Sequence, residues 1–176
     1  MDAGAPRMTK RAIGTLALAL LAACGGEGEL EGSVSDVYRL GHDDVRARLY
    51  DSALSIEYAR DDGSVPVRVS LRLEDVSPEA GNSYDLGEHG SITGQLADGT
   101  SIPPFIDGKL TLDSYRPRQG AAVVGVFTGT FDGVRDTLSL RGEFDTTLEL
   151  VDWPRAPELP DPADAPGAAM AGDAGP

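Results

Sequence analysis

The side chains best suited to acid–base or metal chemistry are two histidines that lie beside carboxylates. His42 is followed by Asp43 and Asp44, and His89 follows Glu88. Imidazole changes its charge near neutral pH, and a neighbouring carboxylate can orient it for proton transfer or metal binding. Surface histidines beside acids are far more often solvated turn residues. We therefore expect neither histidine to be catalytic.

The common motifs of hydrolases and nucleotide enzymes are missing after the N-terminal leader. That part of the sequence has no Gly-x-Ser-x-Gly, no His-Glu-x-x-His, no glycine-rich phosphate loop and no EF-hand loop. We predict a protein that is not an enzyme, with no catalytic residue, no cofactor-binding residue, no metal ligand and no cofactor.

A calcium site is the alternative that the acidic residues leave open. Hard cations bind several oxygen ligands from adjacent loops, and the sequence offers two such pairs, Asp43-Asp44 and Asp61-Asp62. If two hairpins form as the pattern indicates, these pairs lie at opposite ends of their strands. That arrangement disfavours a shared site.

An N-terminal leader, residues 1–23, precedes the single cysteine, Cys24. Lys10 and Arg11 are followed by an uncharged run of about a dozen residues. A membrane-spanning helix needs roughly 20 apolar residues, so this run is a signal peptide rather than a transmembrane segment. We expect translation to begin at Met8, because Asp2 weakens the positive end of a longer leader.

The end of the leader, Leu21-Ala22-Ala23-Cys24, resembles the lipobox of bacterial lipoproteins. The resemblance implies that Cys24 is acylated, with palmitate or a similar chain, and becomes the new N-terminus. It also implies attachment to the outer membrane of a Gram-negative cell envelope, because Gly25 stands where an aspartate would retain the protein at the inner membrane. Residues 24–29 would then form a short tether, and no free thiol would remain.

The charge of the chain limits its partners. It carries 15 basic and 29 acidic residues, a net charge of −14. Anionic lipid and nucleic acid repel such a protein, since phosphate binding requires lysine or arginine to release counterions. We exclude nucleic acid as a partner and expect the membrane to be contacted through the lipid anchor. The protein or small-molecule partner stays unspecified.

Apolar residues of period two, separated by glycine and aspartate, predict an all-β body. The longest alternation places Leu138, Leu140 and Phe144 on one face and Arg141 and Glu143 on the other. A helix would mix these two sets within each turn. We therefore predict one antiparallel β-sandwich over residues 30–153, with a closed small β-barrel as the alternative.

Other strands are predicted along the same body. Residues 45–49 favour a strand, although Val45, Leu49 and Ala53 also fit a helix. Pro66, within the strand 65–73, indicates a sheet edge because proline cannot donate to a ladder. The remaining predictions are strands at 30–40, 54–58, 91–96 and 100–102, a long polar connection at 74–90, and tight turns at Asp62-Gly63, Asp98-Gly99, Asp107-Gly108 and Asp132-Gly133.

The segment 108–144 resembles the C-terminal hairpin of uncharacterised Gram-negative envelope lipoproteins, through its repeated Gly-x-Phe and Leu-x-Leu patterns. This resemblance supports an all-β fold and implies no activity. Residues 154–176 are rich in proline, alanine and acidic residues, and they predict a disordered acidic tail because they cannot bury enough apolar surface.

Two functions follow from these observations. The first is a lipid-anchored envelope protein that acts as a non-catalytic binding or structural module. The second is a carrier of a small apolar ligand, which requires a barrel with an internal cavity. Gly94, Gly125 and Gly142 would leave room for such a cavity, although glycines also mark bulges and bends.

Overall fold

The computed structural model describes residues 26–151. This part of the chain is almost entirely β-structure, which confirms the predicted all-β fold. None of its helices is long and apolar enough to cross a bilayer. The elements are β1 (Glu27–Glu31), η1 (Ser33–Asp36), β2 (Asp44–Leu49), β3 (Ala53–Ala59), β4 (Val65–Arg72), β5 (Asn82–Asp85), α1 (Leu86–His89), β6 (Gly90–Gln95), β7 (Phe105–Ser114), β8 (Ala122–Asp132) and β9 (Thr137–Leu150).

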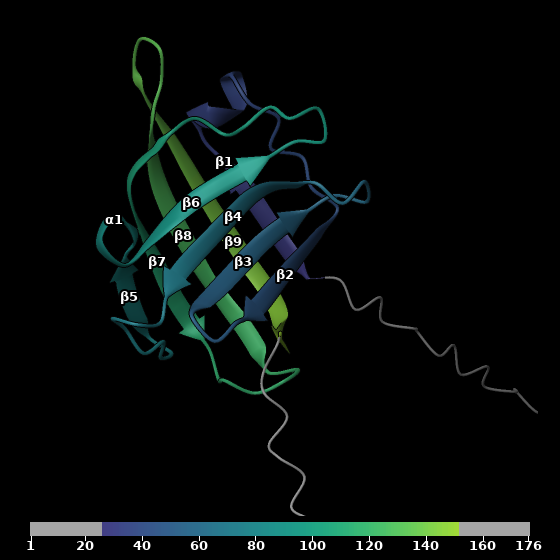
Figure 1. Cartoon of the computed structure of the whole chain (residues 1–176), viewed down its shortest axis with the longest axis vertical. Coiled ribbons are helices and arrows are strands. Elements are labelled where there is room, and N and C mark those ends of the chain that lie inside the picture. Colours follow the sequence, from purple (N-terminus) through teal and green to yellow (C-terminus); the bar gives the residue numbers. More distant parts are fainter. Residues whose placement is uncertain (1–25, 152–176) are drawn as a thin grey trace, which may run out of the picture.

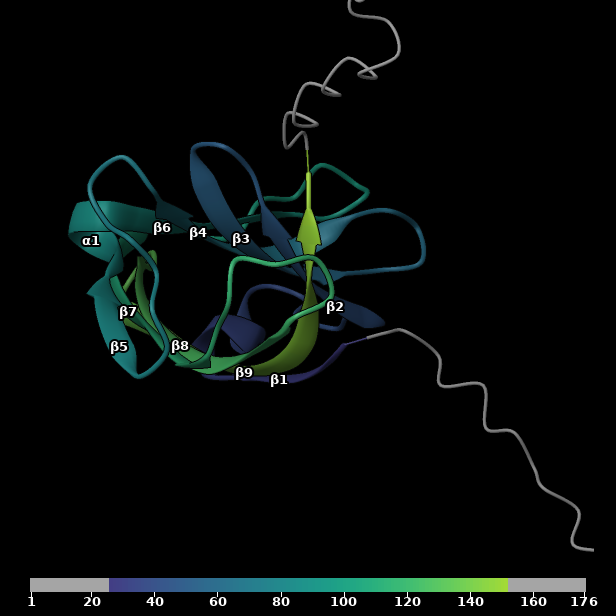
Figure 2. The same cartoon turned by 90° about the horizontal axis from the view of Figure 1, so that it is seen from below.

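The strands form one sheet in the order β5-β7-β8-β9-β2-β3-β4-β6, with β1 paired to β9. The sheet curls until β6 approaches β7, and α1 lies between its two ends, so that the fold is nearly a closed barrel (Figures 1 and 2). The arrangement therefore comes close to the barrel alternative. The sheet is mixed rather than purely antiparallel, because β2 runs parallel to β9 at Ala47 and Leu148.

Strand β9 connects the two halves of the barrel. Its first part lies between β8 and β1, and its last residues pair with β2. The predicted inward phase is confirmed, since Leu140, Phe144 and Leu148 are buried while Arg141 and Glu143 are exposed. Each of these buried side chains contributes about 1.5–3 kcal/mol.

Aromatic side chains fill the barrel axis. Tyr58, Phe127 and Phe131 are fully buried, and the rings of Tyr58 and Phe127 lie 5.9 Å apart. Burial, together with the charge of Glu143, raises the pKa of the Tyr58 phenol. Its protonated hydroxyl donates to the Glu143 carbonyl at 2.7 Å.

The glycines in the strands serve close packing rather than a cavity. A Cβ atom on Gly142 would lie 2.2 Å from the Phe127 ring, and one on Gly94 would lie 1.8 Å from the Pro66 carbonyl oxygen. Real Cβ atoms do not approach other atoms so closely. These positions are therefore occupied by an aromatic ring and by backbone.

The predicted strand at 30–40 is wrong. Strand β1 begins at Glu27 and ends at Glu31, after which Gly32, with φ of 135°, turns the chain into η1. The apolar residues Leu30, Val34 and Tyr38 are spaced by four, which suits a helical turn better than a strand. Val34 and Tyr38 are instead buried in the core.

The edge assignment of Pro66 is also wrong. Strand β6 pairs with β4 on the far side from β3, so β4 is an internal strand. The pairing shifts register between Val65 and Arg68, and this irregularity accommodates the missing proline N–H. The long connection 74–90 likewise contains β5 and α1, whereas the predicted strand at 100–102 is only an isolated bridge at Ser101.

Two of the four predicted Asp-Gly turns have the expected backbone. Gly63 and Gly99 have φ of 82° and 85° and lie in tight turns. Gly108 lies inside β7, where it pairs with Gly129. Gly133 lies in the β8–β9 connection without a positive φ. The strand predicted at 45–49 is confirmed as β2.

Candidate functional site

The structure separates the two histidines. His42 Nε2 lies 3.2 Å from the Gly28 carbonyl oxygen, and its ring packs edge-on against Tyr58 with centroids 4.9 Å apart. His89 belongs to α1, across the barrel from β1, and its Nε2 lies 3.6 Å from Glu88 (Figure 2). The two imidazoles do not share a site.

The aspartates considered for calcium lie at the same end of β2 and β3, contrary to the prediction. Asp43 accepts a hydrogen bond from the Asp61 N–H at 2.9 Å. Asp44 accepts one from the Gly26 N–H at 3.0 Å and pairs with Arg46 at 2.6 Å. These carboxylates are thus engaged in turns and ion pairs. Within residues 26–151, no three His, Cys, Asp or Glu side chains lie together in a way that could hold a metal ion.

Cys24 lies outside the described residues, so its acylation stays a prediction. The chain is held in place from Gly26 onward, since Gly26 bridges to Val45 and donates to Asp44. Only Gly25 separates Cys24 from this point. A lipid on Cys24 would therefore hold the β1 side of the barrel close to the membrane.

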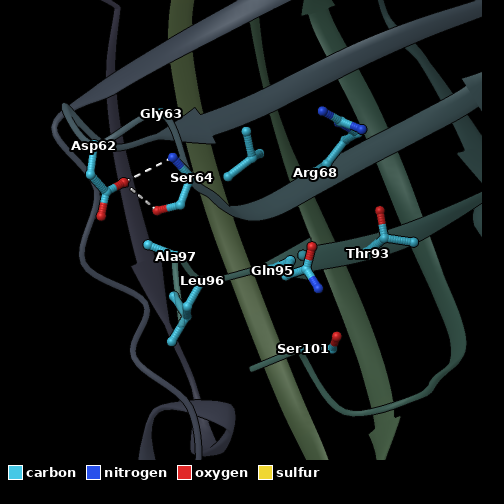
Figure 3. Close-up of a pocket in the computed structure, with 11 residues that line it drawn as sticks. Asp62, Gly63, Ser64, Arg68, Thr93, Gln95, Leu96, Ala97 and Ser101 are labelled. Atoms are coloured by element: carbon cyan, nitrogen blue, oxygen red, sulfur yellow. Dashed lines mark hydrogen bonds between the residues drawn. The ribbon is translucent and has the colours of Figure 1, made fainter. Parts of the chain in front are cut away.

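A polar cleft lies on the outer face of β4 and β6, and we call it the β4–β6 cleft (Figure 3). Its volume is about 740 Å³. The β3–β4 turn forms one wall and the segment after β6 forms another. Its polar lining comprises Asp62, Ser64, Arg68, Thr93, Gln95 and Ser101.

Some of the polar groups in the cleft already make hydrogen bonds or ion pairs with neighbouring residues. Ser64 donates to Asp62 from its hydroxyl at 2.6 Å and from its backbone N–H at 2.8 Å, and these bonds lower the pKa of the Asp62 carboxyl. Arg68 uses Nε to bind Glu57 at 3.0 Å. A guanidinium has five N–H donors, so Arg68, which lines the cleft, keeps donors beyond the one that binds Glu57. Thr93 and Ser101 add exposed hydroxyls.

Four arginines extend this polar region along the outer face of the neighbouring strands. Arg46 and Arg48 on β2 and Arg68 and Arg72 on β4 point outward on the same face, which we call the arginine surface. Strand β3 lies between them and places Glu57 opposite both Arg46 and Arg68.

Glu57 is the most deeply buried charged residue on this surface. Its side chain is 3% exposed and binds Arg48 at 3.2 Å and Arg68 at 3.0 Å. The long arginine stems cover it from both sides. Sequence alternation places Glu57 outward, but alternation alone does not indicate that neighbouring strands would cover it.

The opposite side of the barrel is acidic. On β1 and β9, Glu27 lies directly opposite Asp145, and Glu29 lies directly opposite Glu143. These four carboxylates surround a groove of about 400 Å³, and Asp113 also lines it. Like charges directly opposite one another in an antiparallel pair are destabilising. We call this the acidic surface.

We expect Glu27→Lys to stabilise the barrel. The substitution replaces a repulsive pair with an attractive pair opposite Asp145, and the expected gain is about 0.2–1 kcal/mol. Urea unfolding of the chain from residue 24 onward, at low and high salt, measures it. Glu31→Lys is the matched control, because Glu31 already pairs with Arg141 at 2.9 Å. An equal gain from both variants would contradict the local explanation.

A further hollow, of about 490 Å³, is mainly apolar. It lies at the end of the barrel where the β8–β9 connection is found. Its apolar lining comprises Val37, Pro103, Pro104, Val134 and Leu138. Val37 and Val134 are largely exposed. We call this the apolar hollow. Sequence reasoning missed it because Val37 and Val134 belong to connections without any periodic pattern.

Comparison of the chain with protein-family models, curated proteins and solved structures finds no match. The chemistry of the surfaces described above is therefore the basis for assigning a function.

Proposed function

We propose that this chain is a lipid-anchored protein of the bacterial cell envelope that acts as a non-catalytic binding module. The anchor is acylated Cys24, in the outer membrane of a Gram-negative cell. The binding site is the β4–β6 cleft. The observation that carries the proposal is the position of the hydrogen-bonding groups, which line an outer cleft while the barrel axis is filled with aromatic side chains.

The cleft suits a small polar ligand that carries an anionic group. Arg68 offers its terminal nitrogens to a carboxylate or phosphate, and Thr93, Gln95 and Ser101 offer hydroxyl and amide groups to neighbouring polar atoms. Asp62, the acid in the cleft, is engaged by Ser64. Neither histidine lines the cleft, which supports binding rather than catalysis.

The apolar hollow favours the second candidate, a carrier of a small apolar ligand. Its volume lies within the range of roughly 300–1,000 Å³ that small-molecule sites occupy. It opens at the end of the barrel instead of lying inside it. A carrier of this kind would hold only part of its ligand away from water.

The anchor is tested by the variant Cys24→Ser. We expect the wild-type protein to incorporate radiolabelled palmitate and to fractionate with membranes, and the variant to do neither. Two acyl chains suffice for stable attachment, and the chain without them has no other anchor in this proposal. A Cys24→Ser variant that still fractionates with membranes would exclude acylation as the anchor.

The site is tested by amide chemical shifts during titration with a panel of neutral sugars, carboxylated sugars and fatty acids. We expect carboxylated sugars to shift the amides of Thr93 and Gln95, and Arg68→Gln to abolish the response. Arg118→Gln, an exposed arginine outside the cleft, should leave it unchanged. A response confined to Val134 and Leu138 with fatty acids would instead support the carrier.

A further inference from the structure

The arginine surface is a local exception in an acidic protein. The whole chain has a net charge of −14, yet Arg46, Arg48, Arg68 and Arg72 point outward from two strands that are separated only by β3. Adjacent strands lie about 4.8 Å apart, so the four guanidinium groups share a patch that is roughly 10 Å wide between β2 and β4.

The carboxylates on this surface do not use all of the arginine donors. Glu57 binds Arg48 and Arg68, and Glu149 binds Arg48 at 2.9 Å. Arg46 contacts Asp44 through Nε, and Arg68 contacts Glu57 through Nε. The terminal nitrogens of both arginines stay accessible, and their side chains are 46% and 45% exposed.

Arg72 extends the surface without a carboxylate partner among residues 26–151. Its guanidinium donates to the backbone carbonyl of Glu88. A neutral carbonyl leaves its charge uncompensated. Arg72 therefore adds a cation at the end of the surface where β4 ends.

The C-terminal segment begins at the margin of this surface. The Val151 N–H donates to the Leu49 carbonyl at 2.9 Å, which places the end of the described chain beside the end of β2. Glu149, two residues earlier, already pairs with Arg48. The described chain therefore ends beside the end of β2, the strand that carries Arg46 and Arg48 (Figure 1).

The segment that follows, residues 152–176, has the opposite charge. Arg155 is its single cation. Its acidic residues are Asp152, Glu158, Asp161, Asp164 and Asp173. At about 3.3 Å per residue the segment can extend to roughly 80 Å, which is several times the width of the arginine surface.

We propose that residues 152–176 dock on the arginine surface of the same molecule, where their carboxylates pair with Arg46, Arg68 and Arg72. The acidic surface repels the segment from the other side of the barrel. Single exposed ion pairs contribute only about 0.2–1 kcal/mol each, but the covalent connection supplies a high effective concentration.

This inference goes beyond the proposed function, because it requires neither the lipid anchor nor an external ligand. It is tested on residues 24–176 with Cys24→Ser and a nitroxide attached at Ala165→Cys. At about 20 mM salt we expect selective broadening of the amides of Ser70 and Thr93, which lie on the arginine side. The amides of Thr128 and Glu143, on the other half of the barrel, should be much less affected. At 1 M NaCl, where the Debye length is about 3 Å, the broadening should disappear.

Charge-matched variants separate docking on this surface from a general effect of charge. The triple variant Arg46→Gln, Arg68→Gln, Arg72→Gln should lose the selective broadening. Lys109→Gln, Arg135→Gln, Arg141→Gln removes the same charge at exposed positions away from both the arginine surface and the end of β9, and should retain it.

A variant of the segment itself covers the case in which the arginine triple variant does not fold. Glu158→Gln, Asp161→Asn, Asp164→Asn leaves the barrel unchanged and should also lose the broadening. Broadening that persists in this variant overturns the proposal, as does uniform broadening in the wild-type chain or the absence of broadening. Loss of ligand binding in the cleft would affect the proposed function alone.

Discussion

Leu140→Asp is expected to abolish the cooperative unfolding of the barrel. Leu140 is 1% exposed and lies in the first part of β9, opposite Gly129 of β8. A carboxylate at this position would have to lose its hydration in an apolar core. We expect a loss of more than about 4 kcal/mol, which is comparable with the whole stability of a small domain. Thermal unfolding followed by circular dichroism measures it.

The matched control for this variant is Thr147→Asp. It introduces the same side chain into the same strand on the opposite, exposed face. A surface substitution of this kind changes stability by about 0.5 kcal/mol or less. If both variants melt near the wild-type temperature, the inward phase of β9 is wrong.

Glu57→Gln is expected to have the second largest effect on stability. The carboxylate accepts charge-assisted bonds from Arg48 and Arg68, and hydrogen bonds to charged groups contribute about 1.5–3 kcal/mol. The side chains of the two arginines are 28% and 45% exposed, so water can solvate part of each guanidinium after the change. We therefore expect a loss of about 2 kcal/mol, measured by urea unfolding.

Glu149→Gln tests whether burial is the cause of that loss. Glu149 binds the same arginine, Arg48, at 2.9 Å, but its side chain is 52% exposed. Exposed ion pairs contribute little because water screens the charges and the side chains lose entropy. We expect a change of about 0.5 kcal/mol or less. Equal losses from both variants would show that the pairing itself, and not burial, decides the effect.

The strands were predicted best where apolar and polar residues alternate over many positions. In β9 and β4 each apolar side chain faces the core and each charged one faces outward, because a strand turns successive residues to opposite sides. The N-terminal stretch was predicted wrongly because it lacks this continuous alternation. Its apolar residues are spaced by four, and the structure uses them in β1, η1 and the segment that follows.

Turn chemistry predicted less than periodicity did. Asp62-Gly63 and Asp98-Gly99 form tight turns with positive φ, whereas the dipeptide Asp107-Gly108 lies within β7. A dipeptide favours a turn only by a small free energy. Pairing of β7 with β8 along most of its length overrides that preference.

The candidate site was the least predictable part of the protein. Its cleft combines the β3–β4 turn with β6 and the segment after it, and no local motif marks these residues as neighbours. His42 and the paired aspartates, which do have local motifs, are engaged in packing and turns. Chemistry-bearing residue types alone were therefore a poor guide to the site.

The sequence by itself determined the all-β class, the inward and outward phases of the long strands and the acidity of the chain, because each depends on residues near one another or on composition. Only the tertiary structure decided that the sheet curls almost into a barrel, that Glu57 is covered by two arginines and that the arginines of β2 and β4 share one surface. These features depend on strand order and register, which arise from contacts between residues that are distant in the chain.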